Sequence, residues 1–187
     1  MRDRLVQALG ALTLLVGCNG ALFRFDVSDA DTIAVDRGTV LEALVSDLGF
    51  DFLDADLEVS QALANQGVAP GDVDGVYFTD LTLTVVDPTG ADLAFIDSLE
   101  FFVSGDGLPE QRVAWLDDFP AGVGAVALNL EDVDLTDYVV GESMDFRTRV
   151  AGHRPSQDTA IEAAFTLEIG ATRQGACNQL KKDDGGT

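Results

Sequence analysis

Hydrophobic and polar residues alternate along most of the second half of the chain. Within 81–85, Leu81 and Leu83 lie on one side of an extended chain, and Thr82 and Thr84 lie on the other. A period of two is typical of a β-strand with one buried face. Similar segments, separated by turns rich in Gly, Asp and Pro, occur at 22–27, 76–85, 98–104, 111–116, 125–130, 144–150 and 159–171.

This spacing of strands and turns indicates a mainly β protein, an antiparallel β-sandwich of the immunoglobulin-like or Greek-key type. A phase change at Thr79–Asp80 predicts a β-bulge. Phe101 and Phe102 are adjacent, so one is expected in the core and the other on the opposite face. Val113 and Trp115 are predicted to share a face, with Trp115 in the core; a sugar-stacking surface is the alternative for this ring.

A different period, typical of helix, occurs over about 39–67 and predicts a short α-helical insert near the N-terminus of the domain. Thr39 and Glu42 have the spacing of a capping box, and an apolar stripe follows them. A second helix is predicted over 54–66, with Gly67 ending it. One further helical turn is predicted at 135–139.

The first 18 residues have the parts of an export signal. Arg2 and Arg4 precede a mainly apolar stretch at 5–16, and the small residue Gly17 stands before Cys18. A positive start, an apolar segment and a small residue at the cleavage site mark a secretory signal. A membrane-spanning helix would need about 20 apolar residues. A buried amphipathic helix, or an ordinary signal followed by an incidental cysteine, are the alternatives.

The motif Leu15-Val16-Gly17-Cys18 resembles the lipobox of bacterial lipoproteins. This resemblance implies cleavage between Gly17 and Cys18, diacylation of Cys18 and, usually, acylation of the new amino terminus. Two or three acyl chains would anchor the protein to a membrane, whereas one chain binds only marginally. Asn19, and not Asp, follows the cysteine, which in that family favours the outer membrane over the inner membrane.

We therefore expect four parts in the chain: a signal peptide (1–17), a lipidated cysteine with a short tether (18–21), a single β-sandwich domain (22–174) and a polar tail (175–187). A domain of this length can bury a core. The hydrophobic content of 47% argues against disorder. Because the tether is so short, the domain is expected to lie close to its membrane.

The chain carries a formal net charge of -22. This excess argues against nucleic acid as a partner and against direct adhesion to an anionic membrane surface. The lipid on Cys18 is then the predicted membrane contact, and the sequence identifies no protein or glycan partner. The acidity itself has three interpretations: solubility, cation binding or a salty habitat.

Acidic residues after the segment 125–130 are the sharpest candidates for a metal site. Asp132, Asp134 and Asp137 are close in sequence, and Ca²⁺ prefers oxygen ligands on a turning backbone. The EF-hand spacing is absent, and Asp132 or Asp134 can equally cap the predicted helical turn. No other cofactor and no catalytic residue are predicted.

Few other residues indicate chemistry. His153 is the single histidine, in a predicted loop, and a surface position without a chemical task is the alternative for it. If Cys18 is lipidated, Cys177 has no intramolecular partner. One histidine and no cysteine cluster do not make the usual zinc sets, and neither a Gly-x-Ser-x-Gly elbow nor a phosphate loop occurs.

The stretch 81–90, followed by 99–103, resembles the sandwich of desiccation-related LEA14-like domains. In those domains a strand ends in Asn-Pro and another strand follows. Here Asp87 stands before Pro88. The resemblance covers a small part of the chain and supports a sandwich.

The sequence thus predicts a lipid-anchored envelope protein with a non-enzymatic structural or binding role. One alternative is an exported hydrolase that uses carboxylates or calcium. Another is a carrier of an apolar ligand, with a cavity between the helical insert and the sheet. Two carboxylates facing one pocket would favour the hydrolase, because glycoside hydrolysis needs such a pair.

Overall fold

The computed structural model describes residues 23–38, 55–141, 144–153 and 155–172. The predictions for the signal and Cys18, the helix beginning at Thr39, Cys177 and the polar tail lie outside these ranges. Among the described residues, no helix is long and apolar enough to cross a membrane.

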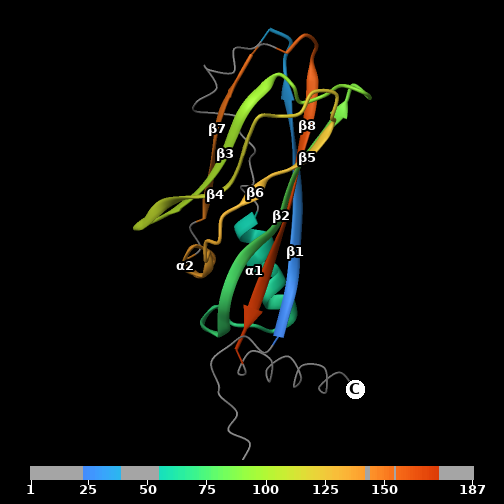
Figure 1. Ribbon diagram of the computed structural model, residues 1–187. Helices are drawn as coiled ribbons and strands as arrows, with labels where there is room; N and C mark the ends of the chain where they lie inside the picture. The colour runs from blue at the N-terminus through green and yellow to red at the C-terminus, as the bar shows by residue number, and fades with distance from the viewer. Residues whose placement is uncertain (1–22, 39–54, 142–143, 154, 173–187) are drawn as a thin grey trace, which may run out of the picture.

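Within these ranges, eight strands form two four-stranded antiparallel sheets, which pack face to face as a β-sandwich (Figure 1). Sheet A has the order β1-β8-β2-β5, and sheet B has the order β6-β4-β3-β7. The predicted mainly β sandwich is confirmed. The elements are β1 (Phe23–Val35), α1 (Ala55–Gln66), a 3₁₀ turn (Pro70–Asp72), β2 (Val73–Asp87), β3 (Ile96–Gly105), β4 (Leu108–Asp117), β5 (Ala125–Ala127), β6 (Asn129–Leu130), α2 (Thr136–Val140), β7 (Asp145–Gly152) and β8 (Thr159–Ala171).

The two long strands β1 and β8 define the ends of the molecule. They pair from Phe23 opposite Ala171 to Val35 opposite Thr159. We call the first of these ends the base and the second the far end. At about 3.4 Å per residue, they lie roughly 40 Å apart. β2 also runs from the base to the far end, where Asp87 pairs with Ala160.

The core lies between the inner faces of the sheets. Along β8, Ile161, Leu167 and Ile169 are 2% exposed or less. Phe78 of β2 contacts Phe165 of β8 and Phe146 of β7, with ring centroids 5.7 and 6.0 Å apart, so these rings join the two sheets. Burial of each such side chain contributes about 1.5–3 kcal/mol.

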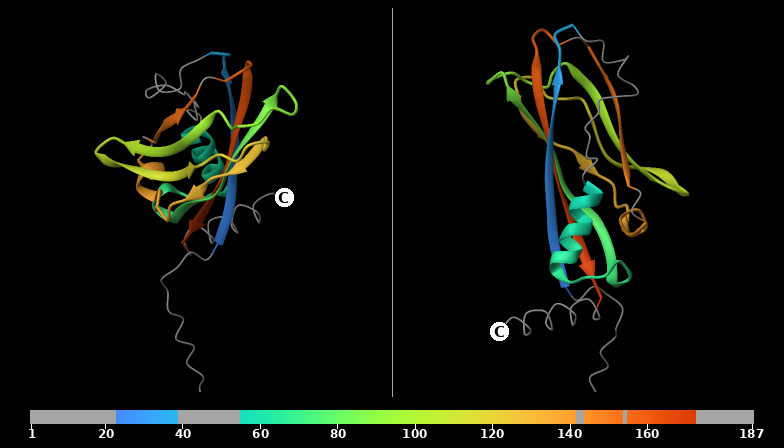
Figure 2. Two further views of the ribbon diagram at one scale, coloured as in Figure 1. Left: turned by 45° about the horizontal axis from the view of Figure 1, so that its top comes forward. Right: turned by 180° about the vertical axis from the view of Figure 1, so that it is seen from behind.

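Helix α1 covers part of sheet A near the base, beyond the edge of sheet B (Figure 2). Val59 and Leu63 are buried on its inner side. The helix ends as predicted at Gly67, whose φ is 68°. The N–H groups of Gly67 and Val68 donate to the carbonyls of Ala64 and Leu63, which is the hydrogen-bond pattern of a Schellman motif.

The bulge predicted in β2 is confirmed. Pairing with β8 passes from Phe78 opposite Leu167 to Asp80 opposite Thr166, which leaves Thr79 unpaired in the ladder. The predicted strand over 125–130 is divided instead. β5 pairs with β2 in sheet A, and β6 pairs with β4 in sheet B.

Leu128 makes the crossing between the two sheets. Its side chain is 7% exposed, and its N–H donates to the Leu81 carbonyl at 2.9 Å. The alternating residues 125–130 therefore contribute one short strand to each sheet. The buried Leu128 lies between these two strands, and no turn separates them.

The prediction that Val113 and Trp115 share a face is wrong. Phe101 pairs with Ala114 but Phe102 pairs with Arg112, so Val113 is the extra residue of a bulge. Val113 and Ala114 are both buried, and the alternation that resumes after them places Trp115 on the outer face of sheet B. Trp115 is half-buried there, with the Arg112 guanidinium 5.3 Å from its ring centroid.

The outer face of sheet B is covered by arginines. Phe101 lies in the core, as one of the two phenylalanines was predicted to, while Phe102 faces outward under the Arg149 guanidinium at 4.1 Å. Arg149 and Arg147 bind the Glu110 carboxylate at 2.8 and 2.9 Å. Each of these arginines is about half exposed, so each ion pair contributes only about 0–1 kcal/mol.

Edge strand β1 carries two acidic residues on its inner face. Asp29 pairs with Phe165 and Asp31 with Ala163, both of which are buried on the inner face of β8. The two carboxylates accept the N–H groups of Ala30 and Thr32, each at 2.7 Å. Inward-pointing charges of this kind disfavour the addition of another strand to a sheet edge.

Candidate functional site

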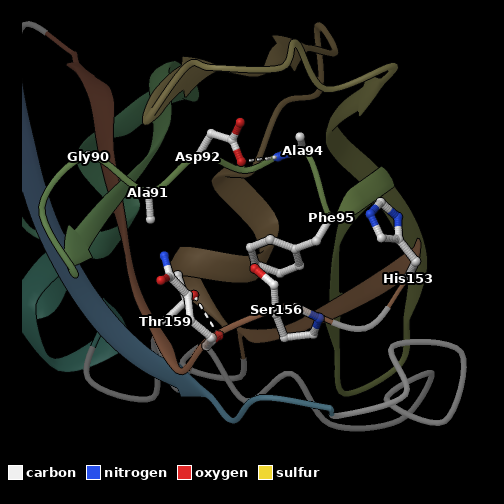
Figure 3. Close-up of a pocket in the computed structure, with 10 residues that line it drawn as sticks. Gly90, Ala91, Asp92, Ala94, Phe95, His153, Ser156 and Thr159 are labelled. Atoms are coloured by element: carbon white, nitrogen blue, oxygen red, sulfur yellow. Dashed lines mark hydrogen bonds between the residues drawn. The ribbon is translucent and has the colours of Figure 1, made fainter.

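Two loops from opposite ends of the sequence meet at the far end of the sandwich. One is 88–95, between β2 and β3, and the other is 153–158, between β7 and β8. Antiparallel pairing brings them together, because β2 ends beside the start of β8 and β3 begins beside the end of β7. They enclose a cavity of about 380 Å³, the far-end pocket, lined by Gly90, Ala91, Asp92, Ala94, Phe95, His153, Pro155, Ser156, Gln157 and Thr159 (Figure 3).

Hydrogen bonds from backbone N–H groups hold the two loops in place. The His153 N–H donates to the Phe95 carbonyl at 2.8 Å, which joins one loop to the other. The Asp92 carboxylate accepts the N–H of Gly122 at 2.6 Å and that of Ala94 at 3.4 Å. The pocket wall is therefore tied to the 120–124 loop.

The pocket has an apolar floor and a polar rim. Phe95 is 8% exposed, and Pro155 is also buried. Figure 3 shows the Phe95 ring between Asp92 and Ser156, with His153 to one side. Ser156, Gln157 and His153 are exposed, so their polar groups face solvent at the mouth.

Among the described residues that line the pocket, His153 and Asp92 both have partners. His153 Nδ1 lies 3.7 Å from Asp97 Oδ1, and both side chains are more than 60% exposed, so the contact is weak. Asp92 is the one carboxylate among the lining residues, and each of its oxygens accepts a backbone N–H. Within the described residues, no hydrogen bond joins Ser156 to His153. The lining therefore presents neither a carboxylate pair nor an activated nucleophile.

The calcium candidates lie elsewhere, between β6 and α2. Asp132 and Asp137 are exposed, whereas Asp134 Oδ1 accepts hydrogen bonds from the Thr136 N–H and hydroxyl at 2.9 and 2.5 Å and from the Val76 N–H at 3.4 Å. In the described part of the chain, no three acidic, His or Cys side chains are arranged to hold a metal ion. Asp134 instead bonds Thr136, the first residue of α2, and ties this segment to β2. It does not cap the helix as the alternative predicted, because Leu135 is the N-cap of α2 and no side chain caps it.

The pKa values of Asp134 and Tyr77 are both shifted from their ordinary values. Partial burial raises the pKa of the Asp134 carboxyl. The hydrogen bonds from Thr136, Val76 and Tyr77 together lower this pKa by more, so the net shift is downward. The negative charge of Asp134, together with partial burial and Asp132, raises the pKa of the Tyr77 hydroxyl. The Tyr77 hydroxyl thus remains a donor, and the Asp134 carboxylate an acceptor, over a wide pH range.

Of the residues that line the far-end pocket, sequence analysis singled out only His153. The turns at 87–90 and 152–155 were both recognisable as loops from their Gly and Pro content. Which loops share an end depends on strand order and register, and those are set by contacts between residues far apart in the chain. Phe95, Ser156 and Gln157 therefore gave no signal of their own.

No protein-family model matches the chain, and no curated protein matches it in sequence. Function therefore has to be inferred from the residues themselves. An apolar-ligand carrier would need a cavity between α1 and the sheets. The far-end pocket and a shallower hollow beside Ser28, Asp80 and Thr166 lie elsewhere, but residues 39–54 of the predicted insert lie outside the described residues, so the carrier alternative stays a prediction.

Proposed function

We infer that the protein is a lipid-anchored protein of the cell envelope whose sandwich holds the far-end pocket away from the membrane to bind a small ligand. The resemblance of residues 15–18 to a lipobox supports the anchor. Only Asn19 to Leu22 separate Cys18 from Phe23, where β1 begins at the base. The position of the pocket at the opposite end, roughly 40 Å along β1, is the observation that carries the proposal.

The pocket itself favours binding over catalysis. A glycosidase needs two carboxyls about 5 Å or about 6.5–9.5 Å apart across a cleft. Among the lining residues only Asp92 is acidic, and its oxygens bind the backbone of its own wall. The other acidic residues that attracted attention in the sequence, such as Asp132 and Asp137, point to solvent away from the pocket.

The lipid determines how firmly the protein is held. Each buried CH₂ of an acyl chain contributes about 0.8 kcal/mol, so two or three chains on Cys18 give stable attachment. Asn19 after the cysteine favours the outer membrane as the destination. Because the tether is short, the base faces the bilayer and the pocket faces outward from it.

Mass spectrometry and membrane fractionation of cells that produce the full chain test the anchor. The wild-type protein is expected in the membrane fraction, with residues 1–17 removed and an acyl-modified Cys18. Cys18→Ala should move the protein out of that fraction. Cys177→Ala is the matched control, since it removes the other cysteine and should leave attachment unchanged. An unmodified Cys18, or a Cys18→Ala variant that stays on the membrane, would contradict the proposal.

A further inference from the structure

The outer face of sheet B gathers most of the positive charge of the described residues. These ranges contain five arginines and no lysine, and three of the arginines, Arg112, Arg147 and Arg149, lie on this face. The whole chain carries a net charge of -22, so two copies repel each other in most orientations. Aromatic residues and arginine are also enriched at the centre of protein interfaces, and Trp115 lies half-buried here beside Arg112.

Strand register arranges this face in neighbouring rows that cross sheet B from β7, at one edge, to β6, at the other. One row consists of Arg147, Phe102, Arg112 and Glu131, and the next consists of Arg149, Glu100, Trp115 and Asn129. Each row thus has an arginine at the β7 edge and a side-chain oxygen at the β6 edge. The other acidic residues of this face, Glu110, Asp117 and Asp145, lie outside these rows.

A twofold axis parallel to the strands, between β3 and β4, makes this face complementary to itself. Such an axis places β7 of each copy over β6 of the other, as two sheets stack in a sandwich. Arg147 then faces the partner's Glu131, and Arg149 faces the partner's Asn129. A twofold axis across the strands would instead place β7 over β7, so that arginine meets arginine, which like-charge repulsion disfavours.

The ion pairs within one copy leave these side chains able to bind another copy. The side chains of Arg147 and Arg149 are 59% and 48% exposed, and each donates to Glu110 through one nitrogen. A guanidinium has five N–H donors, so both arginines retain donors for a second acceptor. The side chain of Glu131 is 38% exposed and has a second oxygen beyond the one that binds Arg112.

We propose that two copies of the chain form a closed dimer through the outer faces of sheet B, about a twofold axis parallel to the strands. β3 begins and β7 ends at the far end, so this axis points the bases of both copies the same way, as two anchors in one membrane require. Each copy uses this face once, so the dimer does not grow into longer oligomers. This inference goes beyond the proposed function and depends on neither the ligand nor the lipid.

Sedimentation equilibrium of the full lipidated chain tests this inference. The protein is kept in a polyoxyethylene detergent whose density matches the solvent, at about 0.15 M salt, where charges more than about 8 Å apart are largely screened. At ordinary strand spacings the face covers roughly 500 Å² per copy, which is small for a specific interface. We therefore expect a weak dimer, present at protein concentrations up to about 100 μM, and no larger species.

Charge reversals locate the interface and identify its axis. Arg147→Glu should weaken the dimer by about tenfold or more, because like charges then meet twice across the axis. Arg24→Glu makes the same change on the outer face of sheet A and should leave the dimer unchanged. Glu131→Arg alone should weaken the dimer as Arg147→Glu does. A mixture of these two variants should recover a heterodimer, because the charges of one contact are exchanged and the other contact is unaltered; recovery also shows that both variants are folded.

Three results would overturn the inference: a wild-type protein that stays monomeric at about 100 μM, equal weakening by Arg147→Glu and Arg24→Glu, or a mixture that associates no better than either variant alone. Cys18→Ala separates this inference from the anchor. It should abolish membrane attachment and leave the dimer intact, so the two proposals can fail independently.

Discussion

At the scale of single residues, Asp134 connects parts of the molecule that are distant in sequence. One of its oxygens accepts hydrogen bonds from Thr136 at the start of α2 and from Val76 in β2. The sequence allowed either a cap or a calcium ligand here, because both use a carboxylate on a turning backbone. The carboxylate instead bonds Thr136 and Val76, and Val76 is far away in the chain and had no visible relation to Asp134.

Asp134→Ala should lower the free energy of unfolding by about 0.5–1 kcal/mol at neutral pH, since it removes the hydrogen bonds to Thr136 and Val76 from a carboxylate that is largely exposed and screened. The folded pKa of Asp134 lies below its ordinary value of 3.8. The stabilisation is therefore complete above about pH 5 and is lost as the pH falls through the lowered pKa. Urea unfolding of both proteins between neutral and acidic pH measures this convergence. Asp132→Ala is the control, and a pH-independent difference would contradict the assignment.

Trp115 shows how one inserted residue reverses a side chain. The alternation in the sequence was regular, and only the Val113 bulge, seen in the pairing with β3, turns the indole outward under Arg112. A bulge in one strand is defined relative to its partner strand. The sequence of β4 alone therefore predicted the strand but not the face of Trp115.

Arg112→Ala should shift the fluorescence of the single tryptophan to longer wavelength and lower the stability of the fold. The guanidinium covers the Trp115 ring and also binds Glu100 and Glu131 at 2.8 and 2.7 Å. Arg112→Lys should recover only part of the loss, because lysine lacks the planar fork. Arg147→Ala, which does not contact the ring, should leave the emission unchanged; equal shifts in both variants would refute the stacking role.

At the scale of elements, alternation and capping predicted most strands and α1 because their signals are local. The helix end at Gly67 needs only a residue that tolerates positive φ. The division of 125–130 into β5 and β6 was not predictable in the same way. Nothing local distinguishes one continuous strand from two short ones that pair with β2 and β4 in different sheets.

Leu128→Ala should destabilise the protein by about 2–4 kcal/mol. The side chain is buried where the chain passes from sheet A to sheet B, and the cavity left behind would loosen β5 and β6 together. Denaturant midpoints measure the effect. The neighbouring variant Asn129→Ala, at an exposed position, should change stability by no more than about 0.5 kcal/mol. Comparable effects at the two positions would contradict the role of Leu128.

At the scale of the whole molecule, the sandwich was predictable and the pocket was not. The fold class follows from the number and spacing of the strands, and the hydrophobic pattern of the sequence predicts both. The far-end pocket requires that 88–95 and 153–158 share an end, which follows from the positions of β2 beside β8 and of β3 beside β7.

The proposed orientation predicts a gradient of distance from the bilayer. In a Cys177→Ala background, a donor dye is placed on Asp74→Cys near the base or on Ser156→Cys at the far end; both sites are exposed. With the lipidated protein in vesicles that contain an acceptor lipid, energy transfer should be stronger from position 74. Equal transfer, or stronger transfer from position 156, would contradict an outward-facing pocket.

Anchoring would also increase the risk that edge strand β1 of one copy pairs with another copy. Lipidated copies diffuse in two dimensions with their bases aligned, so their β1 edges would meet side by side far more often than in free solution. Asp29→Val with Asp31→Val should therefore produce oligomers on vesicles, detectable by crosslinking, while Asp26→Val on the outer face of β1 should not. Monomeric behaviour of the double variant would contradict this role. The two inward aspartates would thus allow a surface to be densely populated without its proteins joining into sheets.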